Sequence, residues 1–183
     1  MEEFIFSLNK TNKIVLKIDS KNEVYREGMI LHYFDQCEVY LILDRKEYLV
    51  FNDYLTEGIK SFCNTLKLVL ANEYPIIEEH FELGEGYFTN EDIDSDFFLP
   101  VLSPIWMSIG KDIHALWLYN YKNKIYLELS PIYPHHSSEI TPCSKTYDEF
   151  RMDYRLDYRT EIEHSLLECW LEQSQGILDS LQI

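Results

Sequence analysis

The stretch DIHALWLYNYKNKIYLELSP, residues 112–131, predicts a β-hairpin at the centre of the fold. Two runs rich in Ile, Leu, Trp and Tyr flank a polar turn around Lys122 and Asn123, as two paired strands joined by a short turn require. Leu116 and Leu118 share one face of the first run, and Trp117 lies on the other. A strand that is apolar on both faces is covered on both sides, so we place it inside a sheet.

Residues 1–51, upstream of this hairpin, predict an antiparallel meander. The apolar side chains alternate with a period of two on either side of the polar turn Lys10-Thr11-Asn12. Further short runs rich in Tyr, Val, Leu and Ile follow over residues 29–34, 38–43 and 48–51, with a charged turn at residues 44–47. Connections this short favour antiparallel neighbours.

Helices are predicted between the two strand regions and at the C-terminal end. Over residues 53–71 the apolar residues recur with helical spacing, and Asn52 is placed to cap the start. Over residues 146–182, pairs with capping-box spacing predict two helix starts, Thr146 with Glu149 and Thr160 with Glu163. The chain therefore reads as a single α+β domain, an antiparallel sheet (meander plus hairpin) packed against two or three helices.

Residues 72–110 separate the first helix from the hairpin and carry most of the charge imbalance. They contain nine carboxylates and no lysine or arginine, which accounts for −9 of the net charge of −16. Prolines and glycines punctuate the segment and favour loops and short elements. Aromatic residues are interleaved with the acids, so the segment is either a surface for a basic partner or a solvated loop whose aromatics pack inward.

The candidate partner-binding residues all lie in this acidic segment. They are Glu78, Glu79, Glu82, Glu85, Tyr87, Phe88, Glu91, Asp92, Asp94 and Asp96. A surplus of negative charge disfavours direct binding to nucleic acid or anionic lipid, since both need Lys and Arg clusters. The same charge could serve solubility alone. With no signal segment and no long apolar run, we expect a cytoplasmic protein that does not enter a membrane, with its four cysteines as reduced thiols.

Metal and catalytic motifs are not found in the sequence, so we expect no cofactor, no metal and no enzyme activity. Asp92, Asp94 and Asp96 resemble the start of a calcium loop, but Phe97 stands where the loop needs glycine, and Ser103 stands where it needs glutamate. The adjacent histidines 135 and 136 point apart in an extended segment. Nucleophile and phosphate-binding motifs do not occur, although dispersed catalytic residues, His114 among the candidates, stay open.

Three segments carry a resemblance to a known class of protein. They are WLY at Trp117–Tyr119, KIYLELSPIYPHH at residues 124–136 and WLEQ at residues 170–173. Together they are similar to small bacterial immunity proteins of polymorphic toxin systems, which are single α+β domains. The resemblance implies a cytosolic antidote that binds one toxin domain stoichiometrically and masks its active site; such toxins are often basic nucleases. Two alternatives stay open: a DNA mimic that inhibits a nucleic-acid-binding protein, and a small enzyme with dispersed active-site residues. The sequence leaves the oligomeric state undetermined.

Overall fold

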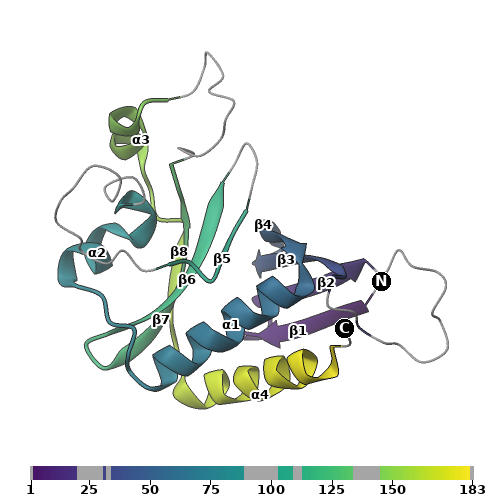
Figure 1. The fold of residues 1–183 in the computed structure, drawn as a ribbon. Helices are drawn as coiled ribbons and strands as arrows, with labels where there is room; N and C mark the ends of the chain where they lie inside the picture. Colours follow the sequence, from purple (N-terminus) through teal and green to yellow (C-terminus); the bar gives the residue numbers. More distant parts are fainter. Residues whose placement is uncertain are drawn as a thin grey trace.

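The computed structural model describes residues 2–19, 31, 34–88, 103–108, 113–133 and 145–181. Within these residues the chain forms one α+β domain that contains two antiparallel four-stranded sheets (Figure 1). The first sheet runs in the order β1 (Glu2–Ser7), β2 (Lys13–Asp19), β3 (Gln36–Leu43) and β4 (Lys46–Tyr54). The second runs in the order β5 (Trp106–Met107), β6 (His114–Tyr121), β7 (Lys124–Pro131) and β8 (Tyr158–Ile162).

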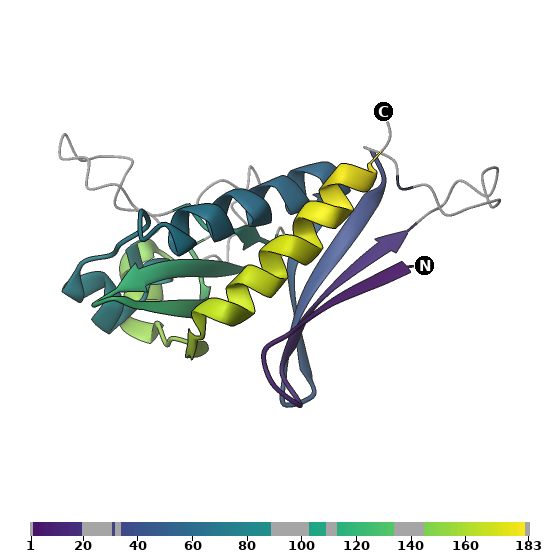
Figure 2. The same cartoon turned by 90° about the horizontal axis from the view of Figure 1, so that it is seen from below.

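Two long helices, α1 (Leu55–Leu70) and α4 (His164–Ser180), lie side by side and pack against both sheets (Figures 1 and 2). One continuous apolar core joins the two sheets and the two helices. Phe6 of β1 contacts Phe62 of α1 edge to face at 5.1 Å, and Phe62 lies 4.7 Å from Trp106 of β5. Aromatic side chains thus link the first sheet, the helices and the second sheet through dispersion and ring-edge contacts.

The predicted hairpin is confirmed as β6 and β7, with every residue from Leu116 to Asn120 buried. Lys122 and Asn123 both have positive φ, 48° and 61°, which is the geometry of the tight two-residue hairpin turn. Leu116 and Leu118 face the main core, whereas Ala115, Trp117 and Tyr119 form a second core on the opposite face. Covering of both faces is therefore confirmed. The meander and the hairpin belong to two separate sheets, however, where the sequence suggested one.

Two predicted helix starts are wrong because sheet pairing extends into them. Asn52 lies in β4 opposite Glu38, so α1 begins three residues later, where the N–H of Leu55 donates to the carbonyl of Asp35 (2.7 Å). Thr160 lies in β8 opposite Leu127, and α4 begins only after Glu163. At both positions, hydrogen bonding with a neighbouring strand outweighs the local capping signal.

Three short elements remain within the described residues. They are α2 (Glu78–Leu83), the 3-10 turn η2 (Glu85–Phe88) and α3 (Tyr147–Asp153). The predicted capping box of α3 is confirmed: the N–H of Glu149 donates to the Thr146 hydroxyl, and the N–H of Thr146 donates to the Glu149 carboxylate. Most of the strand predicted at residues 29–34 lies outside the described residues, and Phe34 is in a turn.

Candidate functional site

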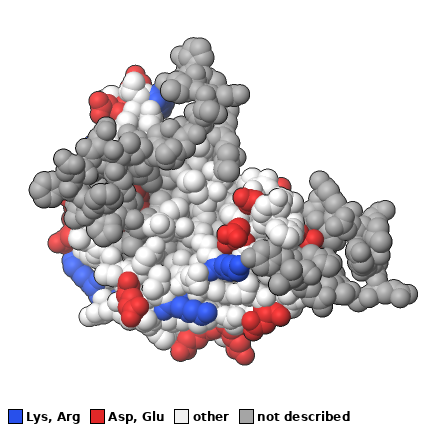
Figure 3. All heavy atoms as spheres, viewed as in Figure 1, with Lys and Arg blue, Asp and Glu red and all other residues white. Residues whose placement is uncertain are grey.

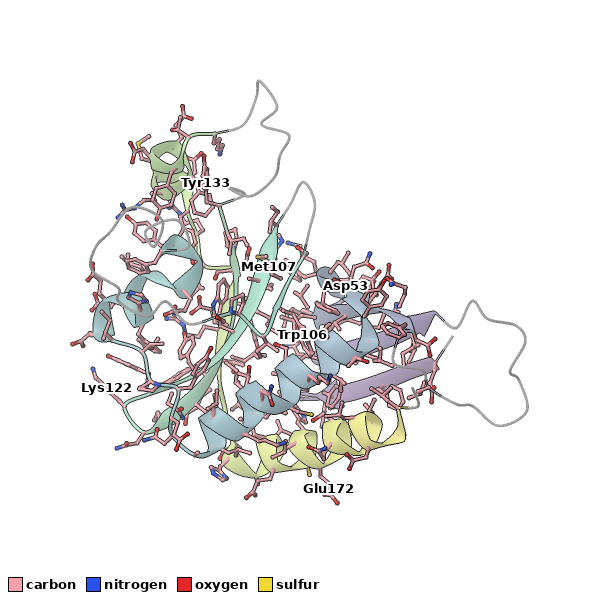
Figure 4. All side chains as sticks on the ribbon, viewed as in Figure 1. Asp53, Trp106, Met107, Lys122, Tyr133 and Glu172 are labelled. Carbon is pink, nitrogen blue, oxygen red and sulfur yellow. The ribbon has the colours of Figure 1, made fainter. Side chains whose placement is uncertain are left out.

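The acidic helix α2 presents three of the predicted partner-binding carboxylates to solvent. Glu78, Glu79 and Glu82 are exposed, and at 100° per residue they occupy one contiguous arc of the helix. His80 and Phe81 point the other way, toward the sheet. The Glu78 carboxylate accepts a hydrogen bond from Lys122 (2.9 Å), which lowers the pKa of Glu78. Lys122 stands on the β6–β7 turn beside α2 (Figure 4).

Two other predicted partner-binding residues are buried. Glu85 is 0% exposed and Phe88 is 4% exposed, and neither can contact a partner in this conformation. Tyr87 is half-buried, with the Arg151 guanidinium 4.3 Å from its ring centre. The other four predicted residues, Glu91, Asp92, Asp94 and Asp96, lie outside the described residues.

Beneath α2, Glu85 pairs with His80 at the edge of a buried polar network. The two atoms His80 Nδ1 and Glu85 Oε1 are 3.0 Å apart, and the His80 ring stacks on Phe88 with a centroid separation of 4.0 Å. Among the described residues, none forms a hydrogen bond with Glu85 Oε2. The pair joins the end of α2 to η2, so a carboxylate that the sequence suggested for a surface instead fixes the path of the chain.

Glu128 of β7 lies at the centre of this network and is 0% exposed. One carboxylate oxygen accepts the Glu85 N–H (2.8 Å) and the Ser130 hydroxyl (3.0 Å). The other accepts the Tyr119 hydroxyl (2.5 Å) and the Arg159 guanidinium (2.9 Å). Burial, reinforced by the charge of Glu128, raises the pKa of Tyr119. The buried anion is thus paired and well hydrogen-bonded, as burial of a charge requires.

Two glycines let α2 and η2 approach this network closely. Gly84 has φ of 100°, a conformation that L side chains rarely adopt, and a Cβ there would lie 3.1 Å from a Glu128 carboxylate oxygen. A Cβ on Gly86 would collide with the carbonyl oxygen of Pro131. The backbone of residues 84–86 therefore lies directly on β7.

Aromatic stacking holds the middle of α2. The Phe81 ring stacks on Tyr121 with centroids 3.9 Å apart, and meets the edge of Tyr126 at 4.9 Å. The Arg159 guanidinium lies 4.4 Å from the Phe81 ring centre and so touches both the aromatic cluster and Glu128. These contacts fix α2 against the sheet, so its exposed acidic side chains project from a helix that is held in place.

The sequence did not single out Glu128 or Arg159, which organise the site. One signal was available: Glu128 is an acid inside a strand whose neighbours are apolar on both faces. A charge in such a position needs a buried partner. The partner could not be named, because Arg159 is 31 residues away and reaches Glu128 only through the pairing of β7 with β8.

The histidine and cysteine candidates do not form a second site within the described residues. Nε2 of His114 lies 3.2 Å from Oδ2 of Asp157. In the described part of the chain no group of three His, Cys, Asp or Glu side chains could hold a metal ion. Residues 135 and 136 and Cys143 lie outside it, as does His32. Cys37, Cys63 and Cys169 are free thiols.

Comparison with protein-family models, curated proteins and solved structures finds no match to this chain. Within the described residues, no helix has the length and apolar character needed to cross a membrane.

Proposed function

We propose that this protein is a non-catalytic inhibitor that binds a basic partner, as an immunity protein neutralises its cognate toxin in a stoichiometric complex. The observation that carries the proposal is the solvent-facing arc of Glu78, Glu79 and Glu82 on a helix anchored from beneath. Anchored charges attract a cationic surface without a large loss of chain entropy on binding. Tyr87, half-exposed on η2, offers an aromatic side chain of the kind that stabilises interfaces.

Charge placement supports an electrostatic role for the acidic arc. Figure 3 shows acidic side chains over α3, along α4 and near the junction of β4 and α1, with a few Lys or Arg side chains between them. The β6–β7 turn brings one lysine, Lys122, to α2, and this lysine engages Glu78. Glu79 and Glu82 add to the field that a basic partner would meet during encounter.

The test compares two variants that remove equal charge from different helices. The first is E78Q/E79Q/E82Q on α2, and the matched control is E168Q/E172Q/D179N on the exposed side of α4, where Glu172 projects into solvent (Figure 4). A basic protein captured from the native cell by the wild-type chain is purified, and its association rate is measured at low salt. We expect the α2 variant to associate at least about tenfold more slowly and the α4 control to retain most of the rate.

Two further readouts separate this proposal from its alternatives. The captured partner should lose its activity at a molar ratio of one to one, and duplex DNA should not displace the inhibitor. Displacement by DNA from several unrelated DNA-binding proteins would instead identify a DNA mimic. Equal association rates for the wild type and the α2 variant would remove the acidic arc from the interface.

A further inference from the structure

Strand β8 forms an outer edge of the second sheet. The strand order places β7 on one side of it, and the five residue pairs from Leu129–Tyr158 to Ile125–Ile162 run without a register shift. Edges are usually protected by short strand length, charged side chains, proline, a bulge or a covering segment. β8 has the sequence YRTEI, with no proline and no bulge, and its two charged side chains, Arg159 and Glu161, are opposite in sign and already pair with Glu128 and Lys124.

The direction of the free backbone groups of β8 follows from the alternation of an antiparallel ladder. The N–H of Ile132 donates to the carbonyl of Ile113, so this pair and every second pair along β6 and β7 is hydrogen-bonded. The intervening residues of β7, including Leu127, therefore bond to β8, and Leu127 pairs with Thr160. The N–H and C=O groups of Arg159 and Glu161 consequently point away from the sheet.

These outward groups have no backbone partner in the described part of the chain. The Glu161 carbonyl accepts a long hydrogen bond from the Thr160 hydroxyl (3.4 Å). An edge strand of the first sheet, β1, differs because the Gln173 side chain donates to the carbonyl of Ile5 (3.2 Å). Helix α4 thus covers part of the β1 edge, whereas β8 keeps two outward donors and two outward acceptors.

We propose that β8 pairs antiparallel with β8 of a second copy of this chain, joining the two second sheets into one. With a two-fold axis at Thr160, Arg159 lies opposite Glu161 of the other copy, and Glu161 lies opposite Arg159. The outward backbone groups of these two residues then satisfy each other. Tyr158 faces Ile162 of the other copy, a pairing of aromatic and β-branched side chains that stabilises antiparallel ladders.

Only this register is self-complementary. A slip by two residues in either direction places Arg159 opposite Arg159, or Glu161 opposite Glu161, and like charges directly opposite destabilise a ladder. Beyond the strand, Asp157 would face Glu163 of the second copy, so pairing is limited to residues 158–162. Each chain also carries a net charge of −16, which opposes association and makes the dimer strengthen as salt screens it.

The test measures molar mass by size-exclusion chromatography with light scattering across a concentration series of the full chain. The wild type should rise from 21.9 kDa toward twice that mass. E161P removes an outward N–H, which an edge strand tolerates in the monomer, and it should remain monomeric throughout. E161A is the matched control: it loses the same carboxylate and its bond to Lys124, keeps the N–H, and should dimerise more than E161P does.

A second measurement keeps the proposal testable if E161P does not fold. Amide hydrogen exchange at Arg159 and Glu161 of the wild type should slow as protein concentration and salt increase, while exchange at Thr160 should not depend on concentration. Any of three results would overturn the β8 dimer. The wild type could stay monomeric, the E161P variant could have the same mass as the wild type, or amide exchange at Arg159 and Glu161 could be independent of protein concentration. Because salt strengthens this association and weakens binding of a basic partner, either proposal can fail without the other.

Discussion

Beneath α2, the Glu128 carboxylate accepts hydrogen bonds from Glu85, Ser130, Tyr119 and Arg159. Replacing Glu128 with glutamine removes the anion and leaves the Arg159 guanidinium, whose side chain is only 15% exposed, without a counter-charge. Breaking a buried pair from one side costs about 3–5 kcal/mol. We expect E128Q to lower the free energy of unfolding by that order in a urea titration. D153N, which breaks the exposed pair with Lys145, is the control and should change it little.

The two glycines 86 and 176 should respond oppositely to alanine. A Cβ on Gly86 meets the Pro131 carbonyl and the Ser130 side chain, so G86A should force η2 away from β7 and destabilise the fold. Gly176 lies in α4 with open space around its Cα, where alanine should stabilise by about 0.5–1 kcal/mol. Thermal unfolding of both variants checks this, and a neutral G86A would contradict the close approach.

Cys37 should make the stability of the fold sensitive to alkaline pH. Burial, with the nearby charges of Asp53 and Glu38, raises the pKa of its thiol from 9.0 to about 12. A folded-state pKa above the unfolded value gives a contribution that is complete below pH 9.0 and lost as pH rises toward 12. The free energy of unfolding of the wild type should therefore fall more steeply over this window than that of C37A. Parallel slopes would show that Cys37 is not the source.

At the scale of elements, α2 should depend on Phe81 more than on its own helical propensity. A six-residue helix is too short to be stable alone, so tertiary contacts must hold it. F81A removes the stack on Tyr121 and the contact with Arg159, and we expect faster amide exchange across α2 together with a loss of about 1–3 kcal/mol. L83A on the same helix, at a site 39% exposed, should alter exchange far less.

Element boundaries show where local sequence signals stop being sufficient. The hairpin β6–β7, the helix α1 and the capping box of α3 follow from periodicity and short-range hydrogen bonding, so they could be predicted. β8 could not, because its Thr160–Glu163 spacing also fits a helix start. Pairing with β7 makes these residues a strand, and that pairing joins residues 29 to 37 positions apart (158 − 129 and 162 − 125).

At the scale of the whole molecule, the net charge of −16 should itself affect stability. Self-repulsion in the compact state is screened by salt, so the Tm should rise between low ionic strength and about 0.15 M. The α4 variant E168Q/E172Q/D179N, with a net charge of −13 (−16 plus three), should gain less from the same addition. A Tm that falls with salt would show that specific ion pairs dominate over general repulsion.

The fold class, the antiparallel meander, the central hairpin and the acidic character of residues 72–110 could all be predicted from the sequence. Each of these depends on residue type, spacing or charge within one short segment. The exposure of Glu78, Glu79 and Glu82 and the burial of Glu85 and Phe88 could not be predicted, because they depend on tertiary packing. The sequence alone does not distinguish a buried glutamate from an exposed one, because burial of a carboxylate requires partners from other parts of the fold. Glu85 is buried beside His80. Glu128 is buried beside Arg159, which reaches it because β8 pairs with β7.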